Sequence, residues 1–315
     1  MKTPSVFIDV HHHFNPIIYS NIPNSLQNKI KSKSSEDLFS HLSFMRNSGI
    51  RKIILSHPVS FQTFSKEENN ILCRKINEGF YTLIKKHKKL GAFSLLPFGN
   101  AINNNQIINE LEYSLFELKL NGIMLPCSVI KSILSDKHFS TFLFSTLNKK
   151  ATAVFLHPYT MEGDKNLNKS KAMLFNEITR SACELSIFQI PQKYSNIKFI
   201  LPNGGGEISY YMSRIVKGHL HADLFDTPEK KESLKHMHDI LKLFYYDMAF
   251  GDDNNMYHCL IKFAEDSKIL WGSNFPESKL HSIEKSIEII KNTYDCNKNS
   301  IYIKCAENSK FLYKR

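Results

Sequence analysis

Several sequence features that mark other classes of protein are absent from this chain. It has no run of about 18 apolar residues, which a transmembrane helix would need. No signal-peptide cleavage pattern follows the short apolar run Val6–Val10. Its six cysteines are scattered without a C-x-x-C pair, which argues against a disulfide framework. We therefore expect a cytoplasmic protein with reduced thiols and no membrane partner.

The positive charge of the chain is not gathered in one place. Lys and Arg total 41 against 30 Asp and Glu, a net charge of +11, but no basic stripe interleaved with aromatic residues occurs. We therefore expect no nucleic-acid partner. No linker or shift in composition divides the sequence either, so residues 1–315 are expected to form a single domain.

Short β-rich runs alternate with longer segments of helical periodicity. The runs are mostly apolar on both faces, which is typical of parallel strands covered by helices. Eight such units predict an α/β protein with a (β/α)8 TIM barrel. A doubly wound open sheet is the main alternative, and the absence of a G-x-G-x-x-G motif after the first strand disfavours it. The predicted strands are Val6–Val10, Lys52–Ser56, Ala92–Leu96, Gly122–Leu125, Ala153–Leu156, Lys198–Leu201, Phe244–Asp247 and Lys268–Trp271.

Histidines end two of the predicted strands. His11 and His13 follow the first strand, and residues i and i+2 of a strand point to the same side, so both imidazoles are expected to face the barrel mouth. His157 ends the fifth strand and adds a third imidazole. One such histidine alone is more often a hydrogen-bonded core or loop residue. The three together predict a site for zinc or a similar divalent metal with an open coordination position, whereas His12 is expected to point toward the helix layer.

Other strand ends carry candidate substrate contacts. Glycines in the turn Asn203–Gly206 permit a close approach of substrate to backbone, although a tight turn alone explains them equally well. Segments 14–33 and 159–171 exceed ordinary loop length and follow strands, where a barrel carries its active-site loops. The residues expected to contact a substrate are Phe14, His57, Tyr159 and Gly204.

Taken together, these strand ends resemble the amidohydrolase-related (amidohydrolase 2) family, which includes aminocarboxymuconate semialdehyde decarboxylase and 6-methylsalicylate decarboxylase-like proteins. The resemblance covers essentially the whole chain. It implies a metal-dependent-hydrolase type of barrel that holds one divalent metal, commonly zinc, with His11, His13 and His157 as ligands. The matching motifs are Ile-Asp-Val-His-His-His-Phe, Val-Phe-Leu-His-Pro, Gly-Gly-Gly, Tyr-Tyr-Asp, Gly-Ser-Asn-Phe-Pro and the closing Glu-Asn-Ser.

Two positions depart from the family pattern. Asn203 stands where the family usually has an acid–base histidine, and Asn274 stands where it usually has a metal-bound aspartate. An amide is neutral and transfers no proton near pH 7, so Asn274 is expected to ligate a metal only weakly, through its carbonyl oxygen. If Asn274 cannot ligate, metal binding is expected to be weakened or absent. Asn203 is expected to orient substrate or water. Losing one acid–base group typically costs about 10²–10⁴-fold in rate.

Nearby carboxylates are candidates to replace the missing acid–base group. Glu207 follows the three glycines, and Glu277 lies three residues beyond Asn274. A solvated carboxylate at a helix start is the simpler explanation for each, because the helix dipole favours it. The candidate catalytic residues are Asn203, Asn274 and Glu207. Asp247, at the end of the seventh strand, is expected to support a ligand rather than to bind the metal.

The leading hypothesis is an enzyme, a metal-dependent decarboxylase (carbon–carbon lyase) acting on a small aromatic or unsaturated carboxylic acid. The metal would stabilise the charge that develops as the bond breaks. A metal-dependent hydrolase of a lactone or amide is the first alternative. The absence of the usual aspartate would impair hydrolysis more than decarboxylation. The second alternative is a catalytically degenerate barrel that binds a ligand or partner. By analogy with the family, a homodimer can form.

Overall fold

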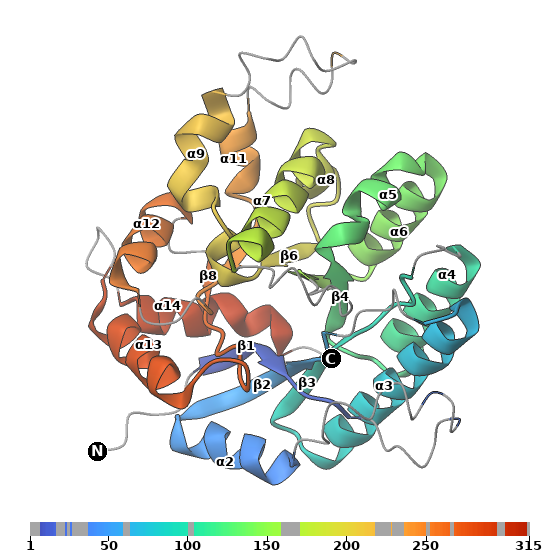
Figure 1. Ribbon diagram of the computed structural model, residues 1–315, viewed down its shortest axis with the longest axis horizontal. Coiled ribbons are helices and arrows are strands. Elements are labelled where there is room, and N and C mark those ends of the chain that lie inside the picture. The colour runs from blue at the N-terminus through green and yellow to red at the C-terminus, as the bar shows by residue number, and fades with distance from the viewer. Residues whose placement is uncertain are drawn as a thin grey trace.

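Eight parallel strands follow one another in chain order around one sheet (Figure 1). The structure is a computed structural model that describes residues 7–16, 23, 26, 37–58, 64–99, 104–158, 171–217, 228, 236–249, 253–264, 268–294 and 300–313. Each strand pairs in parallel with the next. The strands are β1 (Phe7–His13), β2 (Ile50–Ser56), β3 (Leu90–Ser94), β4 (Gly122–Pro126), β5 (Ala153–His157), β6 (Lys198–Leu201), β7 (Tyr245–Asp247) and β8 (Ile269–Leu270).

The segment that follows β8 meets β1 and closes the ring of strands. The amide of Val10 donates to the carbonyl of Trp271 at 3.1 Å, and the amide of His13 donates to the carbonyl of Phe275 at 2.8 Å. A parallel bridge also joins His12 to Phe275. The (β/α)8 TIM barrel expected from the sequence is confirmed.

Helices surround the strands on all sides (Figure 1). Asp37 caps the first of them through its side chain, and Ser65 forms a capping box with Glu68 at the start of the next. None of the described helices is long and apolar enough to cross a membrane. The helices are α2 (Leu38–Asn47), α3 (Lys66–Lys86), α4 (Asn104–Glu112), α5 (Ile130–Ser135), α6 (Lys137–Lys149), α7 (Lys171–Ile187), α8 (Ile190–Lys193), α9 (Ile208–Lys217), α11 (Met237–Leu241), α12 (Asn254–Ala264), α13 (Leu280–Asn292) and α14 (Ile301–Asn308).

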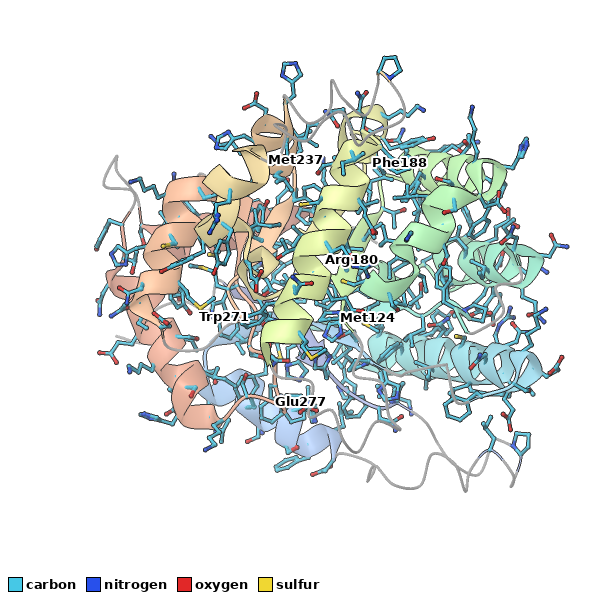
Figure 2. The ribbon with its side chains drawn as sticks, turned by 45° about the horizontal axis from the view of Figure 1, so that its top comes forward. Met124, Arg180, Phe188, Met237, Trp271 and Glu277 are labelled. Carbon is cyan, nitrogen blue, oxygen red and sulfur yellow. The ribbon has the colours of Figure 1, made fainter. Side chains whose placement is uncertain are left out.

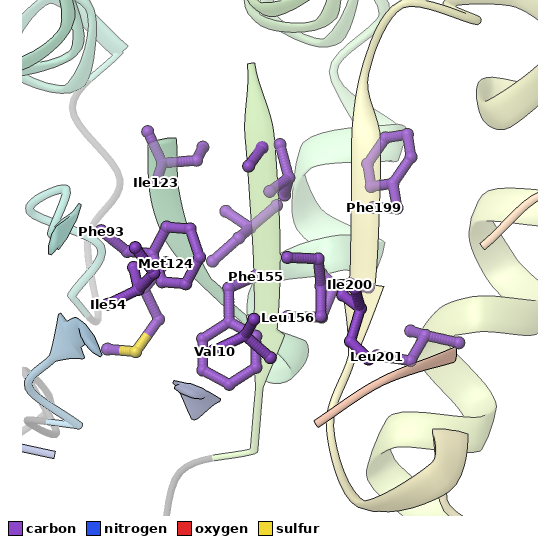
Figure 3. Close-up of a cluster of buried hydrophobic side chains, with 14 of the residues drawn as sticks. Val10, Ile54, Phe93, Ile123, Met124, Phe155, Leu156, Phe199, Ile200 and Leu201 are labelled. Carbon is purple, nitrogen blue, oxygen red and sulfur yellow. The ribbon is translucent and has the colours of Figure 1, made fainter. Parts of the chain in front are cut away.

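Apolar side chains from the strands fill the interior of the barrel. The rings of Phe93 and Phe155 stack with centroids 5.4 Å apart, and both belong to the buried cluster that Figure 3 shows. Trp271 is buried within the ring of helices, as Figure 2 shows. The five described cysteines are free, in agreement with the expected reduced thiols.

Each of the eight predicted strands is present. β6 has the predicted bounds, and the other seven differ at one or both ends. The largest difference is at β1, which was expected to end at Val10 and continues to His13. Its pairing with β2 shifts register between Asp9 and His12, and this irregularity lets the strand continue past the apolar run. The three histidines therefore lie within a strand, where their directions are set by the sheet.

Candidate metal centre

Three imidazoles from opposite parts of the barrel converge at its mouth. His11 and His13 come from the end of β1, and His157 is the last residue of β5. One ligand atom from each lies within 4.8 Å of the other two. Their relative exposures are 1%, 6% and 9%, so the cluster is almost closed to bulk water. The structure thus brings together the three histidines that the sequence singled out.

Hydrogen bonds on the far sides of two rings fix their tautomers. Nδ1 of His11 lies 2.9 Å from a carboxylate oxygen of Asp247 and therefore donates to it. The hydroxyl of Ser56 donates to the carbonyl of His12 at 3.1 Å, so it accepts from Nδ1 of His13 at 2.9 Å. Both rings then carry a lone pair on Nε2, where a metal ligand needs it.

The two lone pairs face each other across a short gap. Nε2 of His11 and Nε2 of His13 lie 3.1 Å apart. Two nitrogens bound to one tetrahedral zinc at about 2.0–2.1 Å are separated by about 3.3 Å. A cation between the nitrogens would convert their mutual repulsion into attraction. The donor set and its spacing therefore fit a divalent metal.

Burial keeps two of the three imidazoles, those of His13 and His157, uncharged. It lowers the pKa of His13 well below its ordinary value, and the neighbouring His11 and His157 lower it further. Burial, followed by the charge of His11, lowers the pKa of His157 to about 3. Because a charged imidazole is disfavoured in this environment, both rings are neutral near pH 7 and their lone pairs are available to a metal.

Asp247 holds the first ligand from behind. One of its oxygens accepts the hydrogen bond from His11, and the other accepts the amides of Asn203 at 2.8 Å and Ala249 at 3.0 Å. The side chain is fully buried. Such a carboxylate fixes the orientation of a ligating histidine and raises its basicity. This is the supporting role expected from the sequence.

A second buried carboxylate joins β1 to the turn after β8. One oxygen of Asp9 accepts the amides of Ser273 at 2.9 Å and His11 at 3.2 Å. Its other oxygen accepts the Ser273 hydroxyl at 2.6 Å and Nδ1 of His12 at 2.9 Å. In the sequence, Asp9 stands out only as part of the motif that contains the first histidines. Its position two residues before His11 was the available signal.

His12 points away from the cluster and toward α2, as expected. Since Nδ1 of His12 donates to a carboxylate, its Nε2 accepts from Nδ1 of His41 at 2.8 Å. Phe275 stacks on His12 with centroids 5.3 Å apart, and Phe14 meets His41 edge to face at 4.9 Å. His41 carried no signal in the sequence, because a single histidine on an amphipathic helix is common.

Asn203 and Asn274 both adopt a left-handed backbone. Their φ angles are 50° and 51°. The amide of Asn274 donates to the carbonyl of His11 at 2.8 Å, and that of Asn203 donates to Asp247. Both residues are half-buried, and both are tied through their backbones to the same histidine–carboxylate pair. Asparagine tolerates this conformation better than most residues, and it places a neutral amide at each position.

Packing requires two of the three glycines after β6, and the backbone conformation favours the third. A Cβ on Gly205 would lie 2.6 Å from the ring of Tyr246, and one on Gly206 would lie 2.2 Å from the carbonyl of Phe175. Gly204 is buried with a φ of 66°. These contacts account for a tight turn from β6 into α9 that packs between β7 and α7, and a substrate contact at Gly204 stays a prediction.

The remaining candidates differ in their surroundings. His57 is buried, and its charge contributes to the lowered pKa of His13. Glu207 is half-buried, and its amide donates to the Thr179 hydroxyl at 2.8 Å. Glu277, labelled in Figure 2, is exposed, which agrees with a solvated carboxylate. Tyr159 lies outside the described residues.

Gly272 leaves the space that His11 occupies. A Cβ at this position would lie 2.6 Å from the Cβ of His11 and 3.4 Å from the carboxyl carbon of Asp247. We expect Gly272→Ala to displace the imidazole, to weaken zinc binding at least about tenfold and to lower the free energy of unfolding by about 1–3 kcal/mol. Competition with a coloured chelator and urea unfolding measure the two effects.

Gly49→Ala provides the matched control. Gly49 precedes β2 at the opposite end of the barrel and has a φ of 69° with no atom within 4 Å of an added Cβ. Its replacement is expected to cost roughly 1–2 kcal/mol of stability through backbone strain alone. Zinc affinity should not change. Equal losses of zinc affinity in the two variants would contradict a specific role for Gly272.

Curated proteins with similar sequences are decarboxylases. The chain is 27% identical over 309 residues to decarboxylase macB of Penicillium terrestre, covering 90% of this chain and 88% of that protein. It is 24% identical over 216 residues to 6-methylsalicylic acid decarboxylase of Penicillium expansum, covering 66% of this chain and 64% of that protein. No family model matches the chain.

Solved structures similar to the chain include amidohydrolase barrels. An amidohydrolase II structure superposes with a TM-score of 0.76 at 18% identity, covering 98% of this chain and 100% of the other. A dihydroxybenzoic acid decarboxylase from Polaromonas sp. JS666, with bound manganese and the inhibitor 2-nitroresorcinol, superposes with a TM-score of 0.74 at 18% identity, covering 98% and 96%. These structures share the barrel fold of the chain. Together with the sequence relatives, they confirm the predicted resemblance, and the named decarboxylases among the relatives support the expectation of an enzyme.

Proposed function

We propose that the chain is a metal-dependent decarboxylase, a carbon–carbon lyase that releases CO2 from a small aromatic carboxylic acid with a hydroxyl group beside the carboxylate. The observation that carries the proposal is the convergence of three buried imidazoles, two of them with Nε2 atoms only 3.1 Å apart. The similarity to decarboxylases over 90% of the chain supports the reaction class. The hydroxybenzoic acids in the names of the relatives support the substrate class.

In this proposal, different residues of the chain bind the metal and orient its ligands. His11, His13 and His157 would hold one divalent metal, with zinc as the first candidate. The metal would supply Lewis-acid stabilisation of the negative charge on the substrate oxygens. Asp247 keeps His11 in the ligating tautomer. The buried position of the cluster excludes water, which strengthens each electrostatic contact with the acid.

Loss of CO2 leaves an electron pair on the ring carbon, and a proton must reach that carbon. Asn203 and Asn274 cannot donate one near pH 7, so we assign them to orienting the substrate through their amide groups. Glu207, beside the glycine turn, is the proposed proton donor. The proposed substrate contacts are Phe14, His57, Tyr159 and Gly204. We also propose that the chain forms a homodimer and is located in the cytoplasm.

Hydrolysis of a lactone or amide has less support. That reaction needs a base for a water molecule, and the described part of the cluster contains no carboxylate among its candidate ligands. Decarboxylation uses the metal to stabilise charge and makes no such demand.

Metal content and product analysis test the proposed function together. Untagged protein is expected to contain about one zinc or manganese ion per chain and to release CO2 from 6-methylsalicylate or a dihydroxybenzoate. The Asn274→Asp variant is purified, loaded with metal and assayed in parallel with the unmodified protein. Turnover of lactones or amides without CO2 release would favour a hydrolase. Loaded protein that turns over none of these compounds would favour a ligand-binding barrel without activity.

A further inference from the structure

The metal-binding cluster carries no negative charge of its own. Within the described part of the chain, the only group of potential ligands at this site consists of His11, His13 and His157, and an imidazole brings no negative charge. The carboxylate of Asp247 contacts the cluster from behind, through Nδ1 of His11, and its other oxygen is held by two backbone amides. A divalent ion would therefore bring two positive charges to a site whose described ligands supply no negative charge. The buried carboxylates of Asp247 and Asp9 contact His11 only through Nδ1 of its ring and through its backbone amide.

The apolar, buried surroundings of the cluster make an uncompensated positive charge unfavourable. The ring of Phe155 lies edge to face against His11 at 5.0 Å and against His157 at 5.5 Å. All three imidazoles are at least nine-tenths buried. An uncompensated charge in such a low-dielectric place is strongly disfavoured, whereas attraction between opposite charges is strengthened there.

Asn274 occupies a position beside the cluster where the chain has an amide and not a carboxylate. Its amide nitrogen donates to the carbonyl of His11, and its side chain is half-buried at the end of the turn after β8. Aspartate has nearly the same shape and also tolerates a φ of 51°. The charge at this position can therefore be changed with little change of structure.

We propose that the metal and a carboxylate ligand bind to this site cooperatively, because the ligand supplies the negative charge that the three imidazoles do not. This inference rests on the metal centre of the proposed function. By linkage, the acid raises the affinity for the metal by the same factor as the metal raises the affinity for the acid. In the absence of an anionic ligand, the chain holds its metal less tightly than it does with the acid bound.

Benzoate and benzamide test the coupling, because they have the same shape and differ in charge. Without a hydroxyl group beside the carboxylate, benzoate is not expected to be decarboxylated during the measurement. Zinc affinity is determined by competition with a coloured chelator, with a parallel titration lacking protein to correct for zinc bound by the acid in solution. Saturating benzoate is expected to lower the apparent Kd for zinc at least about fivefold. Benzamide should change it less than about twofold.

An Asn274→Asp variant tests the origin of the coupling. It is expected to bind zinc at least about tenfold more tightly without benzoate, and benzoate should then have little further effect. Asn196→Asp, an exposed substitution before β6 at the opposite end of the barrel, should keep the full benzoate effect. An undiminished benzoate effect in Asn274→Asp would overturn the assignment of the coupling to missing charge at this site.

The outcomes separate the inference from the proposed function. Tight zinc binding that is the same with benzoate, benzamide or no ligand would refute the coupling and leave the metal centre standing. No zinc binding under any condition would refute the metal centre and the coupling together. Cooperative binding without CO2 release from any hydroxybenzoate would support the coupling and refute the decarboxylase.

Discussion

His157→Ala is expected to lose stoichiometric zinc binding and to release CO2 from a hydroxybenzoate about 10²–10⁴-fold more slowly. The substitution removes the only described ligand that comes from across the barrel, leaving His11 and His13 on one strand. Two imidazoles hold a divalent ion less firmly than three, and the metal is proposed to supply several kcal/mol of transition-state stabilisation. Each 1.4 kcal/mol corresponds to a factor of about ten in rate.

Two measurements distinguish loss of the metal from loss of the fold. Zinc content of the dialysed protein should fall while far-ultraviolet circular dichroism stays unchanged. His138→Ala makes the same chemical change on the exposed face of α6 and should retain both metal and activity. Added imidazole is expected to restore part of the zinc binding to His157→Ala. Full activity of the variant would contradict the proposed role of His157.

Asp247→Asn is expected to weaken zinc binding about 10–100-fold and to lower the free energy of unfolding by about 1–3 kcal/mol. The carboxylate accepts three hydrogen bonds, from His11, Asn203 and Ala249. An amide has one accepting oxygen, so at least one of these donors must lose its partner. If the amide group faces His11, the imidazole must change tautomer and move its lone pair away from the cluster.

Asp136→Asn is the matched control for this second prediction. Asp136 is an exposed N-cap of α6, and asparagine is an equally good capping residue. Zinc affinity and stability should stay close to those of the unmodified protein. Asp247→Asn protein with unaltered zinc affinity would show that the hydrogen bond to His11 does not set the tautomer.

The sequence is sufficient to predict the barrel and the histidine cluster because both depend on local patterns. Apolar runs mark the strands, and alternation along a strand determines which side chains share a face. These two rules alone place His11 and His13 together and turn His12 toward the helices, as the structure has them. The position of His157 follows once the runs are counted around the barrel.

Contacts between distant segments could not be predicted from the sequence. Asp9 binds Ser273 across the closure of the barrel, and His41 on α2 reaches His12. Such pairs depend on side-chain geometry and on a register shift within β1, and neither has a local signature. The role of the three glycines stayed open for the same reason, since the atoms that crowd Gly205 and Gly206 come from β7 and α7.

The closure of the barrel has a consequence for the order in which the protein matures. Hydrogen bonds between β1, which carries His11 and His13, and residues 271–275 hold the strand in place, although some 260 residues separate the two segments in the chain. During synthesis, the first ligands leave the ribosome long before the residues that position them. Metal captured by the nascent chain would therefore meet an unformed site. Zinc loading should follow release of the C-terminal segment, as a late step of biogenesis.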